Sequence, residues 1–226
     1  MALAPMTAAD RDRVTVAVSA AEAGTSGEIV TIVTQQSDGY RDVAIAWAAV
    51  AAFLAIAALG IAPQFYLGLV DRVLGLWASE WTPQAVLGLA LTVATIKFLA
   101  MLLLQLWPPL KFLLIPAPIK TARTHARALT CFKVGAERRT HARTGILIYL
   151  SLAEHRAEII ADEAIAGKVD PAVWGEAMAA MLAHIRDGRI AGGMIAAVEK
   201  VGAVLAEHLP RDENDTNELP DRLIEV

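Results

Sequence analysis

The chain is poor in cysteine and in clustered positive charge, and each absence excludes a class of function. Cys131 is the only cysteine among 226 residues, which excludes an intrachain disulfide framework and a cysteine-based zinc site. The formal net charge is −4 and the isoelectric point is near 5.7, whereas nucleic-acid-binding domains usually carry a basic surface. We therefore expect no nucleic-acid partner.

The familiar catalytic signatures are also missing. The sequence has no Gly-x-Ser-x-Gly elbow, no Walker loop, no His-Glu-x-x-His pair and no Gly-x-Gly-x-x-Gly turn after a predicted strand. His155 adjoins Glu154 in a predicted turn, where a solvated side chain is the default interpretation and acid–base chemistry the alternative. The histidines lie without ligand spacing at His125, His141, His155, His184 and His208. Catalytic residues and cofactor-binding residues therefore stay unassigned.

Long apolar runs, in contrast, are present. Val43 to Ala62 and Val86 to Trp107 are each long enough to cross a hydrocarbon core about 30 Å thick, at about 1.5 Å per helical residue. The chain is 56% hydrophobic with a mean hydropathy of +0.47, yet 19% of its residues are charged, so part of it belongs in water. We predict a multi-pass integral membrane protein with a two-helix transmembrane hairpin.

The segment between the apolar runs, Pro63 to Gln84, has the pattern of an interfacial helix. Its aromatic residues include Tyr66, Trp77 and Trp81, and such rings prefer the headgroup boundary because they are apolar with one hydrogen-bonding edge. An ordinary loop packed against protein is the alternative interpretation.

Lys97 lies near the centre of the second apolar run. An ionised side chain at that depth costs about 2.5–3.5 kcal/mol even on lenient insertion scales. Snorkelling of the side chain, or a span shifted toward one interface, is the commoner explanation. An ion pathway or a subunit contact is the alternative.

Positive charge is distributed unequally around the two runs. The segment between them contains only Arg72, whereas the outer flanks contain Arg41, Lys111, Lys120, Arg123 and Arg127. Because positive charge near span ends favours the cytoplasmic side, we predict that both soluble portions are cytoplasmic. The basic segment from Lys120 to Arg143 also has apolar residues at helical spacing. Its charges form either a solvated helix face or a surface that attracts anionic lipid.

The soluble portions contain helix and strand patterns. Thr7 suits a helix N-cap, and Asp170-Pro171 starts another helix. In chain order we expect a helix from Thr7 to Gly24, strands at Glu28–Thr34, Gly145–Leu152 and Ala157–Ala161, and helices from Pro171 to Gly188 and from Ile190 to His208. The acidic tail, residues 211–226, lacks a period and is predicted to be disordered.

The portion before the spans has too little apolar surface to fold alone, and the later portion has sheet edges that need covering, so we expect one domain. An even number of spans returns the chain to the same side, which lets the strand at Glu28–Thr34 pair with the strand at Gly145–Leu152. The predicted fold class is α/β, a discontinuous helix-flanked mixed β-sheet domain interrupted by a two-helix transmembrane hairpin. Residues 1–40 and 120–210 form the domain, residues 41–119 form the hairpin with its interfacial helix, and residues 211–226 form the tail.

Several sequence motifs occur in an order that resembles the TPM-domain family, in particular its bacterial integral-membrane branch with a transmembrane hairpin inserted in the domain. The motifs are Ala21-Glu22, Thr25-Ser-Gly-Glu28-Ile-Val, Arg143-Thr-Gly-Ile-Leu-Ile-Tyr-Leu-Ser151, Glu158-Ile-Ile-Ala-Asp162, Trp174 and Ala206-Glu-His-Leu-Pro210. The resemblance implies a helix-flanked mixed sheet and, for this branch, the bacterial inner membrane. Relatives in the family include a thylakoid acid phosphatase, photosystem repair factors and receptor-associated proteins, and some bind calcium or similar hard cations.

The resemblance suggests candidate site residues. Glu28 begins one strand and Asp162 ends another, so their carboxylates are candidate ligands of calcium or magnesium, and Glu158 joins them if it faces the same layer. Thr144 and Gly145 are candidate phosphate or ligand contacts at the start of the central strand. Turn caps and surface charges are the alternative interpretation of the carboxylates, and Trp174 is best explained as a core residue.

Two functions from different classes follow. The favoured one is a membrane-tethered binding or assembly module that meets membrane lipids and either a membrane-protein partner or a second copy of itself. The alternative is a metal-assisted phosphatase acting on phosphomonoesters, in which a cation held by Glu28 and Asp162 polarises a phosphoryl oxygen. A transporter is a weaker third reading because the spans offer little polar lining.

Overall fold

The computed structural model of the chain describes residues 6–75, 80–135, 144–211 and 221–226. The elements, in order, are α1 (Ala8–Glu22), β1 (Glu28–Thr34), α2 (Arg41–Ile61), α3 (Pro63–Leu74), α4 (Pro83–Leu104), α5 (Pro108–Leu114), α6 (Ala117–Gly135), β2 (Gly145–Ser151), β3 (Arg156–Ala161), α7 (Glu163–Ala166), α8 (Pro171–Arg186), α9 (Ile190–His208) and β4 (Ile224–Glu225). They form two compact units, one of Met1–Asp38 with Ala117–Val226 and one of Gly39–Pro116.

A four-stranded mixed sheet in the order β3-β2-β1-β4 organises the first unit. β1 is parallel to β2, in a register that runs from Glu28 opposite Gly145 to Thr34 opposite Ser151. β2 and β3 form an antiparallel hairpin, and β4 lies parallel to β1 at the other edge. The predicted pairing of the two central strands is therefore confirmed, although both apolar helices separate them in the chain.

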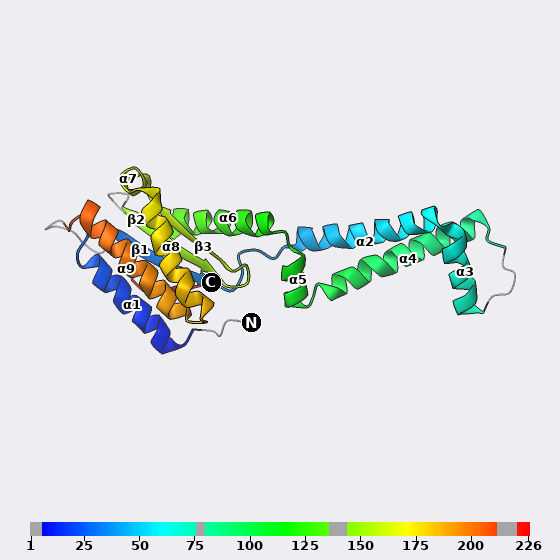
Figure 1. Cartoon of the computed structure of the whole chain (residues 1–226), viewed down its shortest axis with the longest axis horizontal. Helices are drawn as coiled ribbons and strands as arrows, with labels where there is room; N and C mark the ends of the chain where they lie inside the picture. Colours follow the sequence, from blue (N-terminus) through cyan, green and yellow to red (C-terminus); the bar gives the residue numbers. More distant parts are fainter. Residues whose placement is uncertain (1–5, 76–79, 136–143, 212–220) are drawn as a thin grey trace. The chain divides into compact units, whose positions relative to one another are not determined.

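Helices cover both faces of this sheet, which explains why β1 and β2 are buried along their whole length. Alternate residues of the two strands face opposite layers. On one face, Ile29 and Ile146 belong to a core with α1, α8 and α9, and on the other face Val30 and Leu147 pack with Phe132 of α6. Figure 1 shows α6 on one side of the sheet and α1, α8 and α9 on the other. The helix-flanked mixed sheet matches the predicted fold class.

Capping residues determine where two helices of this unit begin, and a glycine allows two of its helices to pack closely. Thr7 and Asp10 form a reciprocal capping box at the start of α1, which confirms the predicted N-cap. Asp170 caps α8, with Pro171 in its first turn. α1 packs directly on α9 at Gly202, where an added Cβ would lie only 2.6 Å from the Cβ of Ala21. Only glycine permits this close approach of the two helices.

The second unit is built around two helices that are long and apolar enough to cross a membrane by length and composition, α2 and α4. They pack against each other, and the side chain of Gln105 donates a hydrogen bond to the Ala44 carbonyl at 3.1 Å. Only 6% of the most apolar window of each helix is buried, so most of its apolar surface faces outward. Such exposure is unlike the core helix of a water-soluble protein.

The bounds of these helices differ by a few residues from the predicted runs. α4 begins at Pro83, capped by Thr82, and ends at Leu104 rather than Trp107. The chain turns before Pro108, which starts α5, because proline cannot continue a helix from the preceding residue. Lys97 is exposed on α4. α3 occupies the predicted interfacial segment, while Trp77 lies outside the described residues.

The acidic tail differs from the prediction of disorder at its end. Residues 212–220 lie outside the described range, but Ile224 and Glu225 pair with β1. The amide of Val226 donates to the carbonyl of Val33 at 3.1 Å, and the Thr34 hydroxyl donates to the Val226 carbonyl at 2.7 Å. Without this strand the edge of β1 would expose unpaired backbone groups. This tertiary requirement orders the end of a segment whose composition indicates disorder.

Candidate functional site

Three of the predicted site residues lie in one row across the start of the sheet. Gly145 is opposite Glu28 on one side, and on the other side its amide donates to the Asp162 carboxylate at 3.1 Å while its carbonyl accepts the Asp162 amide at 3.0 Å. Glu28 and Asp162 are thus two strands apart, about 10 Å between their backbones. Both are buried. The structure therefore places them at the same end of the sheet with a strand between them, and their predicted role as cation ligands stays a prediction.

Glu158 lies elsewhere. It sits within β3 opposite Tyr149, four residues and therefore about 13 Å along the strand from Asp162. Its carboxylate contacts Nδ1 of His125 on α6 at 3.2 Å. Glu158 shares the α6 face of the sheet, but it does not meet the other two carboxylates.

The predicted phosphate contacts already have partners inside the protein. The Thr144 hydroxyl donates to the Ser26 carbonyl at 3.0 Å, and the Thr144 carbonyl accepts the amide of Glu28 at 3.1 Å. The amide of Gly145 is bonded to Asp162. These bonds join the start of β1 to the start of β2, so they give a structural reason for both residues, and their role toward a phosphate stays a prediction.

A small acidic cavity lies beside the start of β1. Its volume is about 140 Å³. Three carboxylates from distant parts of the chain contribute to its wall: Glu22 from the end of α1, Glu28 from β1 and Asp221 from the segment before β4. The remaining lining residues are Ser19, Ala23, Thr25 and Arg211. The cavity therefore forms only when both ends of the chain meet at this edge of the sheet.

Hydrogen bonds hold the carboxylates of the cavity in place. One oxygen of Glu22 accepts the amide of Ile29 at 2.7 Å, which ties the end of α1 to β1. Asp221 accepts a hydrogen bond from the Ser19 hydroxyl. Since Ser19 and Glu22 are three residues apart, they share one face of the helix, and that face is directed at the returning tail.

Burial raises the pKa of Glu22 from its ordinary value near 4.5 to about 8. Desolvation is the largest cause, because it disfavours the charged carboxylate. The amide of Ile29 lowers the pKa in part, and the negative charges of Glu28 and Asp221 raise it further. Glu22 is therefore mainly protonated at neutral pH, and the cavity can hold or release a proton in the physiological range.

The arrangement does not fit a resident metal ion as it stands. Within residues 6–75, 80–135, 144–211 and 221–226, no group of three or more His, Cys, Asp or Glu side chains is placed to hold a metal. Calcium needs six to eight oxygen ligands that converge on one point. We therefore derive no step through a metal, and the assignment of Glu28, Glu158 and Asp162 to calcium or magnesium stays a prediction.

Sequence reasoning missed two members of the acidic cavity, Glu22 and Asp221. Glu22 had a signal, because a carboxylate in the last turn of a helix opposes the helix dipole and needs a compensating partner. Asp221 had none, because its neighbours in the tail have no apolar period that would predict a contact with the sheet. Only the pairing of β4 with β1 places it at the cavity.

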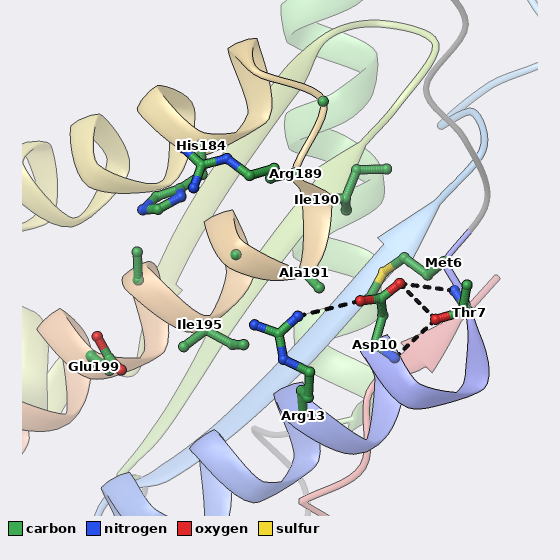
Figure 2. Close-up of a pocket in the computed structure, with 13 residues that line it drawn as sticks. Met6, Thr7, Asp10, Arg13, His184, Arg189, Ile190, Ala191, Ile195 and Glu199 are labelled. Atoms are coloured by element: carbon green, nitrogen blue, oxygen red, sulfur yellow. Dashed lines mark hydrogen bonds and ion pairs between the residues drawn. The ribbon is translucent and has the colours of Figure 1, made fainter.

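A larger cavity of about 530 Å³ lies between the start of α1 and the turn from α8 to α9. Figure 2 shows Arg13 directed toward Asp10, with Ile195 and Ala191 of α9 on the opposite wall. Its charged lining residues are Asp10, Glu199, Arg13 and Arg189, two of each sign. Arg13 pairs with Asp10 at 3.5 Å, and Arg189 pairs with the neighbouring Asp187 at 2.7 Å. The cavity therefore has no excess of one charge that would indicate a ligand class, and none of the predicted site residues lines it.

Comparisons with known proteins agree with this fold. A family model described as TPM domain matches residues 119–204, which span most of α6 to α9. The solved NMR structure of BA42 protein from the psychrophilic bacterium Bizionia argentinensis is similar to the chain with a TM-score of 0.56 at 17% identity, over 98% of this chain and 95% of that one. At this identity the likeness shows the fold alone. A search of curated proteins finds no match.

Proposed function

We propose that the chain is a membrane-tethered binding or assembly module of the bacterial inner membrane, with a TPM-like domain at the cytoplasmic surface. One observation carries the proposal. β1 and β2 are adjacent strands of one sheet, although α2 and α4 lie between them in the chain. Because the two parts of the domain must meet, the apolar segment between them has to return the chain to the side of the membrane from which it entered. Two spans do this.

The surface of α2 and α4 supports insertion of both helices. Large apolar side chains such as Phe53, Leu87 and Leu103 are about two-thirds exposed, and exposure of this kind is unfavourable in water. Surrounded by hydrocarbon, the same side chains contact lipid tails, and each helix bonds its own backbone groups internally. Membrane lipids are therefore the first partner of this chain.

The distribution of positive charge favours an orientation with both parts of the domain in the cytoplasm. Arg41 precedes the first span, and Lys111, Lys120, Arg123 and Arg127 follow the second, whereas the intervening segment contains only Arg72. By the positive-inside tendency both parts of the domain lie in the cytoplasm. The BA42 likeness adds the fold only, and the family match adds the TPM domain over residues 119–204.

Binding rather than catalysis is the use that the described groups support best. The acidic cavity offers carboxylates that accept hydrogen bonds and hold a proton, and its Ser19 hydroxyl is already committed to Asp221. Two spans serve as an anchor for a domain that meets a membrane-protein partner or a second copy of the chain.

Two measurements test this function. Vesicle flotation of the purified chain after alkaline carbonate treatment should recover it with lipid, since spanning helices resist extraction. Recovery in the aqueous fraction would contradict tethering. In nanodiscs, mass measurement should show either a dimer or a defined complex with a co-purified membrane protein. A monomer with no stable partner would contradict the assembly role.

The phosphatase alternative has its own test. We expect no hydrolysis of generic phosphomonoesters with calcium, magnesium or manganese, from acidic to alkaline pH. Hydrolysis that depends on Glu28, being lost in Glu28→Gln and kept in a matched surface variant such as Glu176→Gln, would replace the binding module with an enzyme.

A further inference from the structure

The outer face of α6 is basic while its inner face packs on the sheet. Ala128 and Phe132 are buried on the inner face with Val30 and Leu147. Four basic residues follow the outer and flanking positions of the same helix. Arg123, Arg127 and Lys133 are exposed and Lys120 is half-buried. The helix thus covers the core with one side and presents positive charge on the other.

Little of this charge is neutralised within the protein. Arg123 pairs with Asp38 at 3.3 Å, and His125 contacts Glu158 at 3.2 Å. Within the described parts of the chain, the structure gives Lys120, Arg127 and Lys133 no ion-pair partner. A solvated helix face usually carries both signs, so a face of one sign indicates a partner of the opposite charge.

The sequence around α6 strengthens this charge asymmetry. From residue 81 to residue 136 the chain contains no Asp or Glu. The segment includes α4, α5 and α6, so the second apolar helix runs into a positively charged stretch that its own residues do not neutralise. A basic helix without acidic residues suits approach to an anionic surface.

The chain position of α6 identifies that surface. α6 begins at Ala117, directly after the apolar unit that ends at Pro116. If α4 spans the bilayer, as proposed above, α6 emerges on the side where α4 ends and is held near the headgroups there. Such tethering raises the effective concentration of the surface that the helix meets.

We propose that the outer face of α6 docks on anionic phospholipid headgroups of the leaflet at which α4 ends. This inference rests on the proposed membrane tether. The Arg127 guanidinium can bond a phosphate through two N–H groups, while Lys120 and Lys133 act as point charges. Val134 is 66% exposed, and because it follows Arg127 by seven residues, about two helical turns, it adds an apolar contact on the Arg127 side of the helix. Each of the three charges changes the ratio of docked to free domain about fivefold, so together they act on the order of 100-fold.

A fluorophore on α6 measures this docking in the full-length chain. The background variant is Cys131→Ser, because Cys131 is the only native cysteine, and an environment-sensitive dye is attached through Thr130→Cys on the exposed part of the helix. The protein is reconstituted into vesicles of phosphatidylcholine alone or of phosphatidylcholine with phosphatidylglycerol. Both contain a lipid that carries a quencher near its headgroup.

We expect strong quenching in the anionic vesicles and weak quenching in the neutral ones. High salt should abolish the difference, since it screens the charges. The triple variant Lys120→Gln/Arg127→Gln/Lys133→Gln should lose most of the quenching in anionic vesicles. The matched control is the triple variant Lys168→Gln/Arg186→Gln/Lys200→Gln, which removes the same charge from exposed positions away from α6. Its dye should be quenched to the same extent as in the parent.

Each contradictory result has a separate meaning. Flotation with lipid after carbonate treatment is recorded for every sample, so a chain that fails to insert contradicts the tether. A chain that inserts but is quenched equally in both vesicles overturns the docking of α6 on anionic lipid. Equal losses in the two triple variants would also overturn it, because the effect would then follow net charge rather than α6. Circular dichroism of each variant verifies that the helices are intact.

Discussion

At the scale of single residues, the acidic cavity couples the two ends of the chain through one titrating group. The Glu22 carboxylate accepts a hydrogen bond from the amide of Ile29, and it lines the cavity together with Asp221. The sequence places Glu22 at the C-terminal end of a helix, where its negative charge opposes the helix dipole. It places Glu28 at the start of a strand. The meeting of these two with Asp221 could not be predicted, because it depends on a tertiary contact of the tail.

The raised pKa of Glu22 makes stability depend on pH. In the folded chain the pKa is about 8 against an ordinary value near 4.5, so the folded state binds more protons than the unfolded state between these values. Stability should therefore be greatest below about pH 4.5 as far as this group is concerned and should fall as pH rises toward 8.

The variant Glu22→Gln tests that dependence. It keeps an oxygen to accept the Ile29 amide but cannot ionise, so the decline of melting temperature between these pH values should flatten. Melting is followed by circular dichroism in detergent. The control Glu199→Gln changes an exposed glutamate of α9 and should keep the parent's slope. An unchanged slope in Glu22→Gln would refute the assignment.

Gly202 provides a second test at this scale. A Cβ there would lie 2.6 Å from the Cβ of Ala21 and 3.2 Å from its Cα, so Gly202→Ala should force α1 away from α9 and destabilise the fold by about 1–3 kcal/mol. Gly175→Ala on α8 is the matched control, because its Cβ meets open space and alanine favours helix by up to about 1 kcal/mol. A neutral Gly202→Ala, measured by denaturant unfolding, would contradict this packing.

At the scale of elements, strands and helices with a strong local sequence pattern could be predicted, whereas a short strand that depends on a tertiary contact could not. β1 and β2 are runs of β-branched and aliphatic residues, and α8 begins at Asp170-Pro171, so each could be located within a few residues. β4 consists of two residues and owes its existence to the edge of β1. Glu158 could be placed on a strand from the sequence, but its partner His125 could not, because it lies on a helix far away in the chain.

The role of β4 can be tested by removal of residues 221–226. The deletion should expose the edge of β1 and increase amide exchange at Val33 and its neighbours, because Val33 loses a strand partner and its carbonyl loses the Val226 amide. Arg11→Gln is the control, since it removes the exposed ion pair with Glu225 at 3.6 Å and a 3.5 Å hydrogen bond to the Met6 carbonyl. It leaves β4 in place and should cost less than about 1 kcal/mol. Unaltered exchange in β1 after the deletion would show that β4 does not protect it.

At the scale of the whole molecule, the structure consists of a domain with its own core and an apolar insertion. The core of the domain is formed by α1, α8 and α9 against one face of the sheet and α6 against the other. The discontinuous organisation was predictable because a lone helix and strand before the insertion bury too little surface to fold. The bounds of the spans were less predictable, since the apolar pattern continues through the turn before Pro108.

This organisation predicts that the insertion is dispensable for folding. Replacement of Val43 to Trp107 by a flexible linker should give a soluble protein with the mixed α/β signature in circular dichroism and a cooperative thermal transition. An equal-length replacement that also removes β1 should not fold, because β2 would lose its partner. An unfolded product of the first replacement would mean that the spans contribute to the core.

The central claim is that both parts of the domain lie on one side of a membrane crossed twice, and cysteine labelling tests it directly. In the Cys131→Ser background, single cysteines are placed at exposed positions by Ala9→Cys before the spans, Gln64→Cys between them and Ala179→Cys after them. A maleimide that cannot cross the inner membrane is applied to cells whose outer membrane has been made permeable. The account predicts labelling of the Gln64→Cys variant alone, with all three labelled after the membrane is opened. Labelling of Ala9→Cys or Ala179→Cys before the membrane is opened would contradict it.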